Sequence, residues 1–148
     1  MSFAFLLDKK DKIPKWIYKN NRYFVAFLAG YFDAEGYMGV RKNNTSEWGI
    51  SSYDKNILRH IYKKLNGFNI VCLKPWISRE KGYVDDLFGY RNSDRWSVGV
   101  FRKKSLLRLL NLMGPHLKHP KNTKNMRMVI RNINERNKKF GNPRMALI

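Results

Sequence analysis

The sequence has little of several features that would each mark a class of protein. Its single cysteine, Cys72, excludes an intramolecular disulfide, and no pair of C-x-x-C elements offers a zinc site. No apolar run approaches the length of a membrane span, and the apolar patch near the N-terminus is too short for a secretory signal. We therefore expect a soluble, intracellular protein of a reducing compartment, either the cytoplasm of a prokaryote or an organelle of a eukaryote.

Acidic residues are also scarce. The chain has 11 Asp and Glu against 30 Lys and Arg, which gives a net charge of +19 that is spread along the sequence. A surface that served only solubility would not need so much self-repulsion. A polyanion gains affinity for such a surface by releasing counterions. We therefore expect a nucleic-acid partner, although charge alone leaves open both an RNA-binding structural protein and a DNA enzyme.

The length of 148 residues predicts one domain that buries roughly 70% of its unfolded surface. We expect an N-terminal extension over residues 1–22, a single domain over 23–136 and a C-terminal tail over 137–148. Within the extension, Pro14 is suited to open a short helix through Tyr18. We assign no chemistry to the extension.

The hydrophobic pattern of the central domain predicts an α+β fold. Helices are expected from Tyr23 to a stop at Asp33–Gly36 and over 55–65, 103–113 and 122–137, and strands over 37–42, 48–53, 71–79 and 95–101. Asp54 is predicted to be the N-cap of the second helix. Residues 80–94 are long for a hairpin loop, so they are either functional or contain a misread strand. The result is a four-stranded antiparallel sheet with helices on one face.

The other face of this sheet should be polar, basic and aromatic. Tyr37 begins its first strand, and the positions that point away from the apolar ones are Arg41, Asn43, Glu47, Ser51, Lys74, Trp76, Ser78, Arg95 and Ser97. A twisted antiparallel sheet with such a face can lie in the major groove of DNA, where Arg, Asn and Ser read base edges and Lys holds phosphates. An ordinary solvated sheet face is the alternative.

Small residues form a stripe along the first helix. Ala26, Gly30 and Ala34 are spaced four residues apart, which lets a second helix approach closely. Because Gly30 costs about 1 kcal/mol inside a helix, packing should compensate for it. The simplest partner is the same helix of a second subunit, and we place Ala26, Gly30 and Asp33 at this dimer interface. Packing of Gly30 against the chain's own sheet is the alternative.

Two carboxylates, Asp33 and Glu35, lie at the end of the same helix, where the helix dipole disfavours negative charge. A structural role in the turn, as a cap or hydrogen-bond acceptor, would explain Asp33. Glu35 has no such explanation. In a protein this basic, a carboxylate at a helix end beside a glycine is a candidate ligand for a hard divalent cation.

The segment LAGYFDAEG, Leu28–Gly36, resembles the motif of the LAGLIDADG homing endonucleases. The match lies at Leu28, Ala29, Gly30, Asp33, Ala34 and Gly36, with Glu35 at the acidic metal position, where family members often carry Asp. The order of helices and strand pairs across 23–136 resembles the αββαββα core of that family. A single motif resembles the homodimeric branch, whose members bind long, nearly palindromic DNA sites.

The resemblance implies an enzyme of intron homing that binds double-stranded DNA as a homodimer. Glu35 and the Ala34 carbonyl would bind Mg²⁺ or another divalent cation, and the product would be a double-strand break with short 3′ overhangs. A lysine near the scissile phosphate is expected among Lys118, Lys121 and Lys124, of which we favour Lys121. Asp54 lines up with a polar residue that orders active-site water, with capping as the alternative.

The histidines offer little further chemistry. His116 and His119 are better explained as surface or phosphate contacts than as metal ligands, and His60 as a structural residue. The competing functional hypothesis is a non-catalytic nucleic-acid binder, such as an RNA splicing maturase or a transcriptional regulator. Glu35 argues against it, because a binder has no need of a carboxylate beside phosphates.

Overall fold

The computed structural model describes residues 11–82, 84–85, 89–90 and 92–140. Its helices are α2 (Lys15–Tyr18), α3 (Asn21–Glu35), α4 (Lys55–Gly67), α5 (Lys103–Met113), the short 3₁₀ helix η1 (Gly114–His116) and α6 (Pro120–Phe140). Its strands are β1 (Gly36–Val40), β2 (Ser46–Ser52), β3 (Trp76–Arg79), β4 (Val84–Asp85), β5 (Gly89–Tyr90) and β6 (Arg95–Val100). Among the helices of the described residues, none has an apolar stretch long enough to cross a bilayer.

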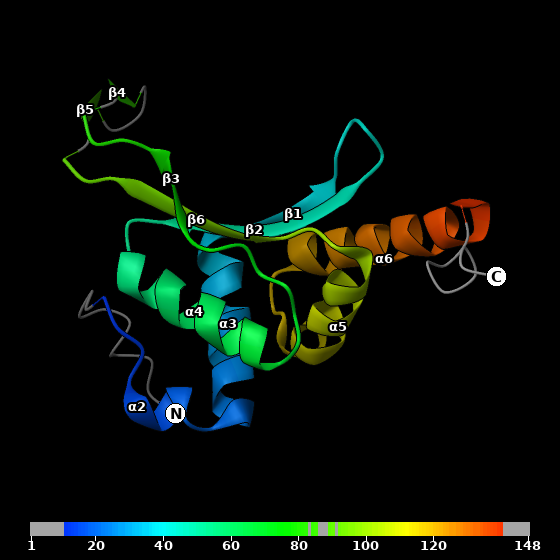
Figure 1. The fold of residues 1–148 in the computed structure, drawn as a ribbon, viewed down its shortest axis with the longest axis horizontal. Helices are drawn as coiled ribbons and strands as arrows, with labels where there is room; N and C mark the ends of the chain where they lie inside the picture. Colours follow the sequence, from blue (N-terminus) through cyan, green and yellow to red (C-terminus); the bar gives the residue numbers. More distant parts are fainter. Residues whose placement is uncertain (1–10, 83, 86–88, 91, 141–148) are drawn as a thin grey trace.

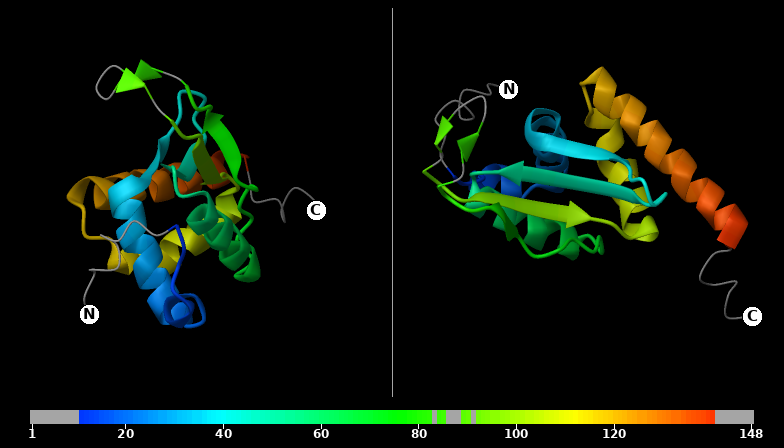
Figure 2. Two further views of the ribbon diagram at one scale, coloured as in Figure 1. Left: turned by 90° about the vertical axis from the view of Figure 1, so that its left-hand side faces the viewer. Right: turned by 90° about the horizontal axis from the view of Figure 1, so that it is seen from above.

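Four strands form one antiparallel sheet in the order β1-β2-β6-β3, and the helices lie together on one side of it (Figure 1). The two ends of the sheet rise away from the helices, so the face without helices is concave. Seen from above, α6 runs obliquely and extends past the sheet (Figure 2). The predicted α+β class, with a four-stranded antiparallel sheet and helices on one face, is confirmed.

The core lies between the sheet and the helices. Trp48 of β2 is fully buried and stacks on Phe32 of α3, with ring centroids 5.2 Å apart and planes 8° apart. Its neighbours across the sheet are Met38 of β1 and Val100 of β6, which are also buried. The alternating pattern of the strands therefore directs their apolar side chains to the helices.

The N-terminal segment packs into the same core. The expected short helix after Pro14 is α2, and Ile13 and Ile17 on either side of its start are buried. The Lys64 ammonium group of α4 donates a hydrogen bond of 2.7 Å to the Tyr18 carbonyl oxygen. The boundary predicted after residue 22 thus divides two segments that share one core, and the first ten residues lie outside the described part.

The cap of α4 differs from the prediction. Asp54 occupies the N-cap position, but its side chain makes no capping hydrogen bond. Instead, the Asp11 carboxylate accepts hydrogen bonds from the backbone N–H groups of Asn56 and Ile57, both at 3.0 Å. The predicted N-cap position of Asp54 is therefore confirmed, but its side chain bonds to Tyr31 and the carboxylate of Asp11, distant in sequence, caps the first turn instead.

The second strand pair is also shorter than predicted. β3 begins at Trp76 rather than Val71, because Pro75 has no N–H to donate to a ladder. The long connection contains the hairpin β4–β5, with Val84 paired to Tyr90, so the alternative of an unrecognised strand is confirmed. The last helix runs to Phe140, three residues past its predicted end, and residues 141–148 lie outside the described part.

A buried asparagine attaches α6 to the turn between β1 and β2. The Asn132 side-chain amide donates to the carbonyl oxygen and to Oδ1 of Asn44, both at 3.0 Å, while its own Oδ1 accepts from the Ser46 hydroxyl at 2.6 Å. Asn44 has a φ of 65°, a left-handed conformation that Asn adopts more readily than most residues. These bonds hold the hairpin against the end of the helix layer.

Replacing the cap that joins the N-terminal segment to α4 should lower stability. An Asp11→Ala change leaves two N–H groups of the first turn without their acceptor, which typically costs 0.5 to 2 kcal/mol, so we expect a loss of about 1 kcal/mol. Urea unfolding measures this loss, with Lys12→Ala as the control on the exposed neighbouring residue. Equal stability of the two variants would contradict the assignment of the cap.

Candidate active site and nucleic-acid interface

The end of α3 delivers Glu35 to the surface at the border of the sheet. β1 begins at the next residue, Gly36, with no loop between helix and strand. Any side chain at Gly36 would overlap the buried Phe32 ring, so only glycine permits this direct change from helix to strand. Glu35 itself is exposed.

A second carboxylate, Asp54, lies close to Glu35. Its Oδ2 accepts hydrogen bonds from the hydroxyls of Tyr31, at 2.8 Å, and Ser52, at 3.1 Å. Burial raises the pKa of Tyr31, so its hydroxyl stays protonated and available as a donor. No hydrogen bond to the other oxygen, Oδ1, is found within the described residues. The bonds to Tyr31 and Ser52 thus fix the orientation of Asp54.

Burial and neighbouring charges both act on the Glu35 carboxylate. Partial burial, followed by the nearby charge of Asp54, raises the pKa of Glu35, while Arg95 lowers it. Two hard carboxylates that repel one another are suited to a divalent metal. No cluster of three or more potential ligand side chains occurs in the described part of the chain. Glu35 is therefore a candidate ligand for such an ion, and Asp54 adds negative charge beside it.

Asp33 holds the start of α6 against the end of α3. Its carboxylate accepts hydrogen bonds from the backbone N–H groups of Lys118 (2.7 Å) and His119 (3.3 Å) and from the side-chain amide of Asn122 (2.9 Å). Asp33 thus has a structural role, as expected. Its carboxylate oxygens accept hydrogen bonds from residues 85 or more positions away in the sequence rather than from its own turn. That Asp33 also lies in a dimer interface stays a prediction.

These bonds position Lys121, the second residue of α6. Lys121 is exposed and lines a hollow of about 300 Å³ beside Gly36 and Tyr37. Its backbone N–H donates to Nδ1 of His119 at 3.2 Å, so His119 helps to shape this turn. The hollow joins the end of α3 to the start of α6, and it brings the favoured lysine to the same border of the sheet as Glu35.

The small-residue stripe of α3 lies on the surface. A side chain added at Gly30 would meet no other atom within 4 Å, and Ala34 is exposed while Ala26 is half-buried. The alternative that Gly30 packs against the chain's own sheet is therefore wrong. The stripe leaves room for a partner outside the described residues of this chain.

The concave face of the sheet has a floor that the sequence did not predict. Gly49 of β2 and Gly99 of β6 are paired across the sheet. Any side chain at Gly49 would overlap the Tyr37 ring, and one at Gly99 would meet the rings of Phe101 and Trp76. Glycine inside a strand is the signal that could have indicated such close packing of rings on the backbone.

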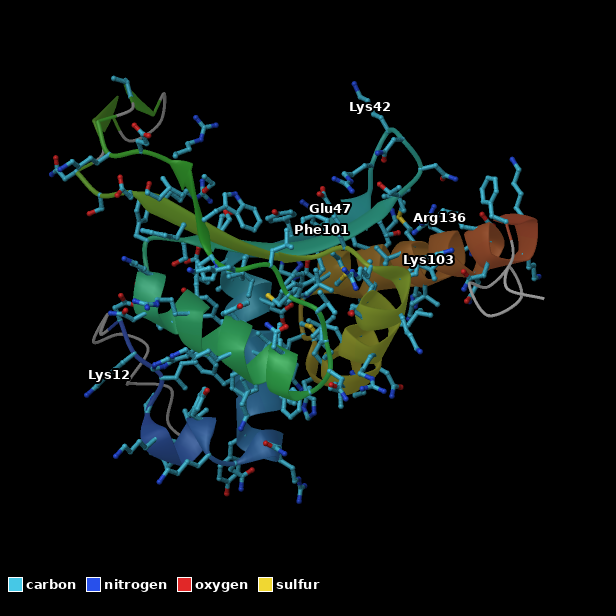
Figure 3. All side chains as sticks on the ribbon, in the orientation of Figure 1. Lys12, Lys42, Glu47, Phe101, Lys103 and Arg136 are labelled. Atoms are coloured by element: carbon cyan, nitrogen blue, oxygen red, sulfur yellow. The ribbon has the colours of Figure 1, made fainter. Side chains whose placement is uncertain are left out.

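Charged side chains lie above one end of this floor. The Arg41 guanidinium is 5.3 Å from the centre of the Phe101 ring, and its Nε is 3.9 Å from a carboxylate oxygen of Glu47. Glu47 and Phe101 project on the upper side of the sheet, and Lys42 extends from the hairpin tip (Figure 3). Asn43 accepts from the backbone N–H and hydroxyl of Thr45 and so closes the turn.

Some of the residues predicted for this face are not available there. Ser97 has the expected parity but is 2% exposed, and its Oγ lies 2.6 Å from that of Ser51, so its expected exposure is wrong. The Ser78 hydroxyl donates to the Arg95 carbonyl oxygen at 3.1 Å. Lys74 lies before β3 and lines a hollow with residues of α4, so its predicted place on the sheet face is wrong. Tyr37, Trp76 and Arg95 retain the predicted positions.

The electrostatics of Glu35 predict how its replacement affects stability. Because the folded pKa of Glu35 is raised, its contribution to stability is complete below the unfolded pKa and is lost as pH rises through the folded value. With chelator present, Glu35→Gln should be more stable than the unmodified protein at pH 7, and this gain should vanish at about pH 4. Urea unfolding at both pH values measures the gain. Glu135→Gln controls for removing one negative charge, and a stability loss at pH 7 in both variants would contradict the prediction.

Comparison with known families agrees with this geometry. A family model described as a LAGLIDADG-like domain matches residues 23–114, from the third residue of α3 to the start of η1. The matched segment includes Glu35 and Asp54 but not α6, which carries Lys121. A search of curated proteins finds no match. Because the matched segment covers more than half of the 148 residues, the chain belongs to the LAGLIDADG family.

Proposed function

We propose that this protein is a site-specific endonuclease that cuts both strands of DNA as a homodimer with Mg²⁺ or another divalent cation. The LAGLIDADG family binds DNA and includes homing endonucleases and maturases. One observation carries the choice of nuclease. The exposed Glu35 and the half-buried, oriented Asp54 form a pair of carboxylates at the border of a concave, partly basic sheet face.

The proposed dimer forms through the open face of α3. Gly30 lets the two helix backbones approach, and a two-fold axis beside this stripe brings both copies of Glu35 to the centre of the assembly. The concave sheet faces of the two subunits then lie on the same side of the dimer and form one long surface. Such a surface spans about two turns of DNA, roughly 20 base pairs, which suits a nearly palindromic site.

The catalytic centre needs a cation that offsets two neighbouring carboxylates. Glu35 of each subunit and the Ala34 carbonyl, at the open C-terminal end of a helix, would hold it together with phosphate oxygens. When bound, it supplies Lewis-acid chemistry that activates a water and stabilises the leaving 3′ oxygen. Asp54 keeps Oδ1 available to accept a hydrogen bond from that water, since Tyr31 and Ser52 occupy Oδ2.

Two cations of the chain are suited to bind the phosphate that is cut. Lys121 lines the hollow next to Gly36, and the charge of Arg95 already acts on Glu35. Positive charge held in place stabilises the negative charge that develops on phosphate in the transition state. Arg95 therefore joins Lys121 in this role, beyond the base-reading role predicted for it from the strand pattern.

A non-catalytic binder remains the second candidate because the family includes maturases. The carboxylate pair argues against it. Without a bound cation, Glu35 and Asp54 would repel the phosphates that the surrounding basic residues attract. A pure binder gains nothing from this repulsion, whereas a metal-dependent nuclease requires the same two groups.

Removing the Glu35 charge should abolish cleavage and preserve binding. The substrate is the DNA that flanks the gene, joined without its insertion, and the reaction is followed on gels with Mg²⁺ and with chelator. We expect Glu35→Gln to lower the cleavage rate at least about 100-fold while the affinity for DNA changes little. Glu135→Gln on α6 is the matched control. Unchanged cleavage by Glu35→Gln would overturn the catalytic assignment.

A large side chain on the α3 stripe should separate the subunits. Gly30→Leu places its side chain in open space in one chain, so the fold is preserved, but it blocks the approach of a second helix. Sedimentation velocity should show a dimer for the unmodified protein and a monomer for this variant.

Gly67 provides the control for this experiment, because a side chain there also meets no atom within 4 Å. Gly67→Leu should remain dimeric. A monomeric unmodified protein, or equal dissociation of the two variants, would contradict the proposed interface.

A further inference from the structure

A second basic site lies on the helix side of the sheet, away from the concave face. It is a hollow of about 330 Å³ between α4 and the segment before β3, which we call the α4 hollow. Its lining includes four cations and two aromatic rings, namely Lys55, Arg59, Lys63, Lys74, Tyr62 and Trp96. None of its lining residues is acidic. The proposed nuclease reaction uses none of these side chains.

The cations of the α4 hollow form an ordered row. Lys55, Arg59 and Lys63 are spaced four residues apart and therefore lie along one face of α4. No ion pair involving these three or Lys74 is found within the described residues. Lys64, by contrast, donates to the Tyr18 carbonyl and packs over aromatic rings, so it belongs to the core. The row thus presents uncompensated positive charge to solvent.

The α4 hollow and the concave face lie on opposite sides of the sheet. Trp96 shares its parity with Val98 and Val100, which are buried beneath the sheet. Arg95 and Gly99 alternate with them and face the concave side. A duplex bound in the concave face therefore does not reach the ring of Trp96, and the α4 hollow needs a different ligand.

The aromatic rings identify the class of that ligand. The Lys55 ammonium group lies 4.5 Å from the centre of the Trp96 ring, and this flexible side chain is free to move aside. Bases stack on such rings, and stacking is stronger than a solvent-exposed cation–π contact. A duplex has no free base face to offer, whereas an unpaired strand has.

We propose that the α4 hollow binds single-stranded nucleic acid. One unstacked base enters over Trp96 and Tyr62, and the flanking phosphates lie along Arg59, Lys63 and Lys74. This site acts independently of the proposed cleavage, so a failed nuclease assay leaves it unaffected. RNA and single-stranded DNA share the chemistry that the hollow recognises.

Binding of labelled single strands of about 12 nucleotides, oligo-U and oligo-dT, tests the proposal by fluorescence anisotropy with the full chain. Reversing two charges in Arg59→Glu/Lys63→Glu should weaken binding at least about tenfold. Lys15→Glu/Lys19→Glu makes the same change in net charge on exposed residues at α2 and should weaken it less than about threefold. Equal losses would overturn the site, because they would indicate binding by net charge alone.

Two further probes test whether binding needs a base and whether it needs a single strand. An abasic oligodeoxynucleotide of the same length should bind at least about tenfold more weakly than oligo-dT, and equal affinity would overturn the stacking role of Trp96. A duplex of mixed sequence should lose little affinity to Arg59→Glu/Lys63→Glu, and a loss as large as for single strands would overturn the proposal. Tighter binding of oligo-U or of oligo-dT identifies RNA or DNA as the ligand.

Discussion

The stacking of Phe32 on Trp48 determines where the end of α3 meets the sheet, and the rest of the candidate site depends on that position. Both rings are fully buried and nearly parallel, so the last turn of the helix is fixed against β2. Gly36 then lets the chain enter β1 directly above the Phe32 ring. Residues on either side of this junction have no freedom to move apart. Glu35 consequently faces Asp54, while Asp33 faces the start of α6.

Acidic residues are few in this chain, and those near the site divide into two kinds. Asp33 and Asp11 accept backbone N–H groups and hold segments that are distant in sequence. Glu35 and Asp54 instead remain close to one another, and burial, followed by their mutual repulsion, raises the pKa of Glu35 against the opposing charge of Arg95. The structural acids hold distant segments of the fold together, and the pair of Glu35 and Asp54 lies where we propose the cation site.

Positive charge is distributed over both sides of the sheet. On the concave side, Arg41 and Arg95 lie beside a floor of aromatic rings on paired glycines. On the helix side, the row on α4 surrounds Trp96. A single duplex contacts only one of these surfaces, which is the physical reason for assigning them to different nucleic acids. Part of the net charge of +19 thus lies on two separate surfaces, and each of them combines basic side chains with different aromatic rings.

The sequence by itself determined the fold class and the position of Glu35, because periodicity and the helix-end motif are local properties of the chain. It also indicated the stripe at Gly30, although only the structure showed that this stripe faces open space. Tertiary structure decided the roles that depend on distant partners. Asp54 was expected to cap α4, yet the hydroxyl of Tyr31 binds it and Asp11 supplies the cap. Lys74 and Ser97 had the parity of the concave face, but Pro75 delays the start of β3 and Ser51 bonds to Ser97. Such contacts join residues far apart in the chain, and spacing along the sequence carries no information about which of two available donors lies nearer.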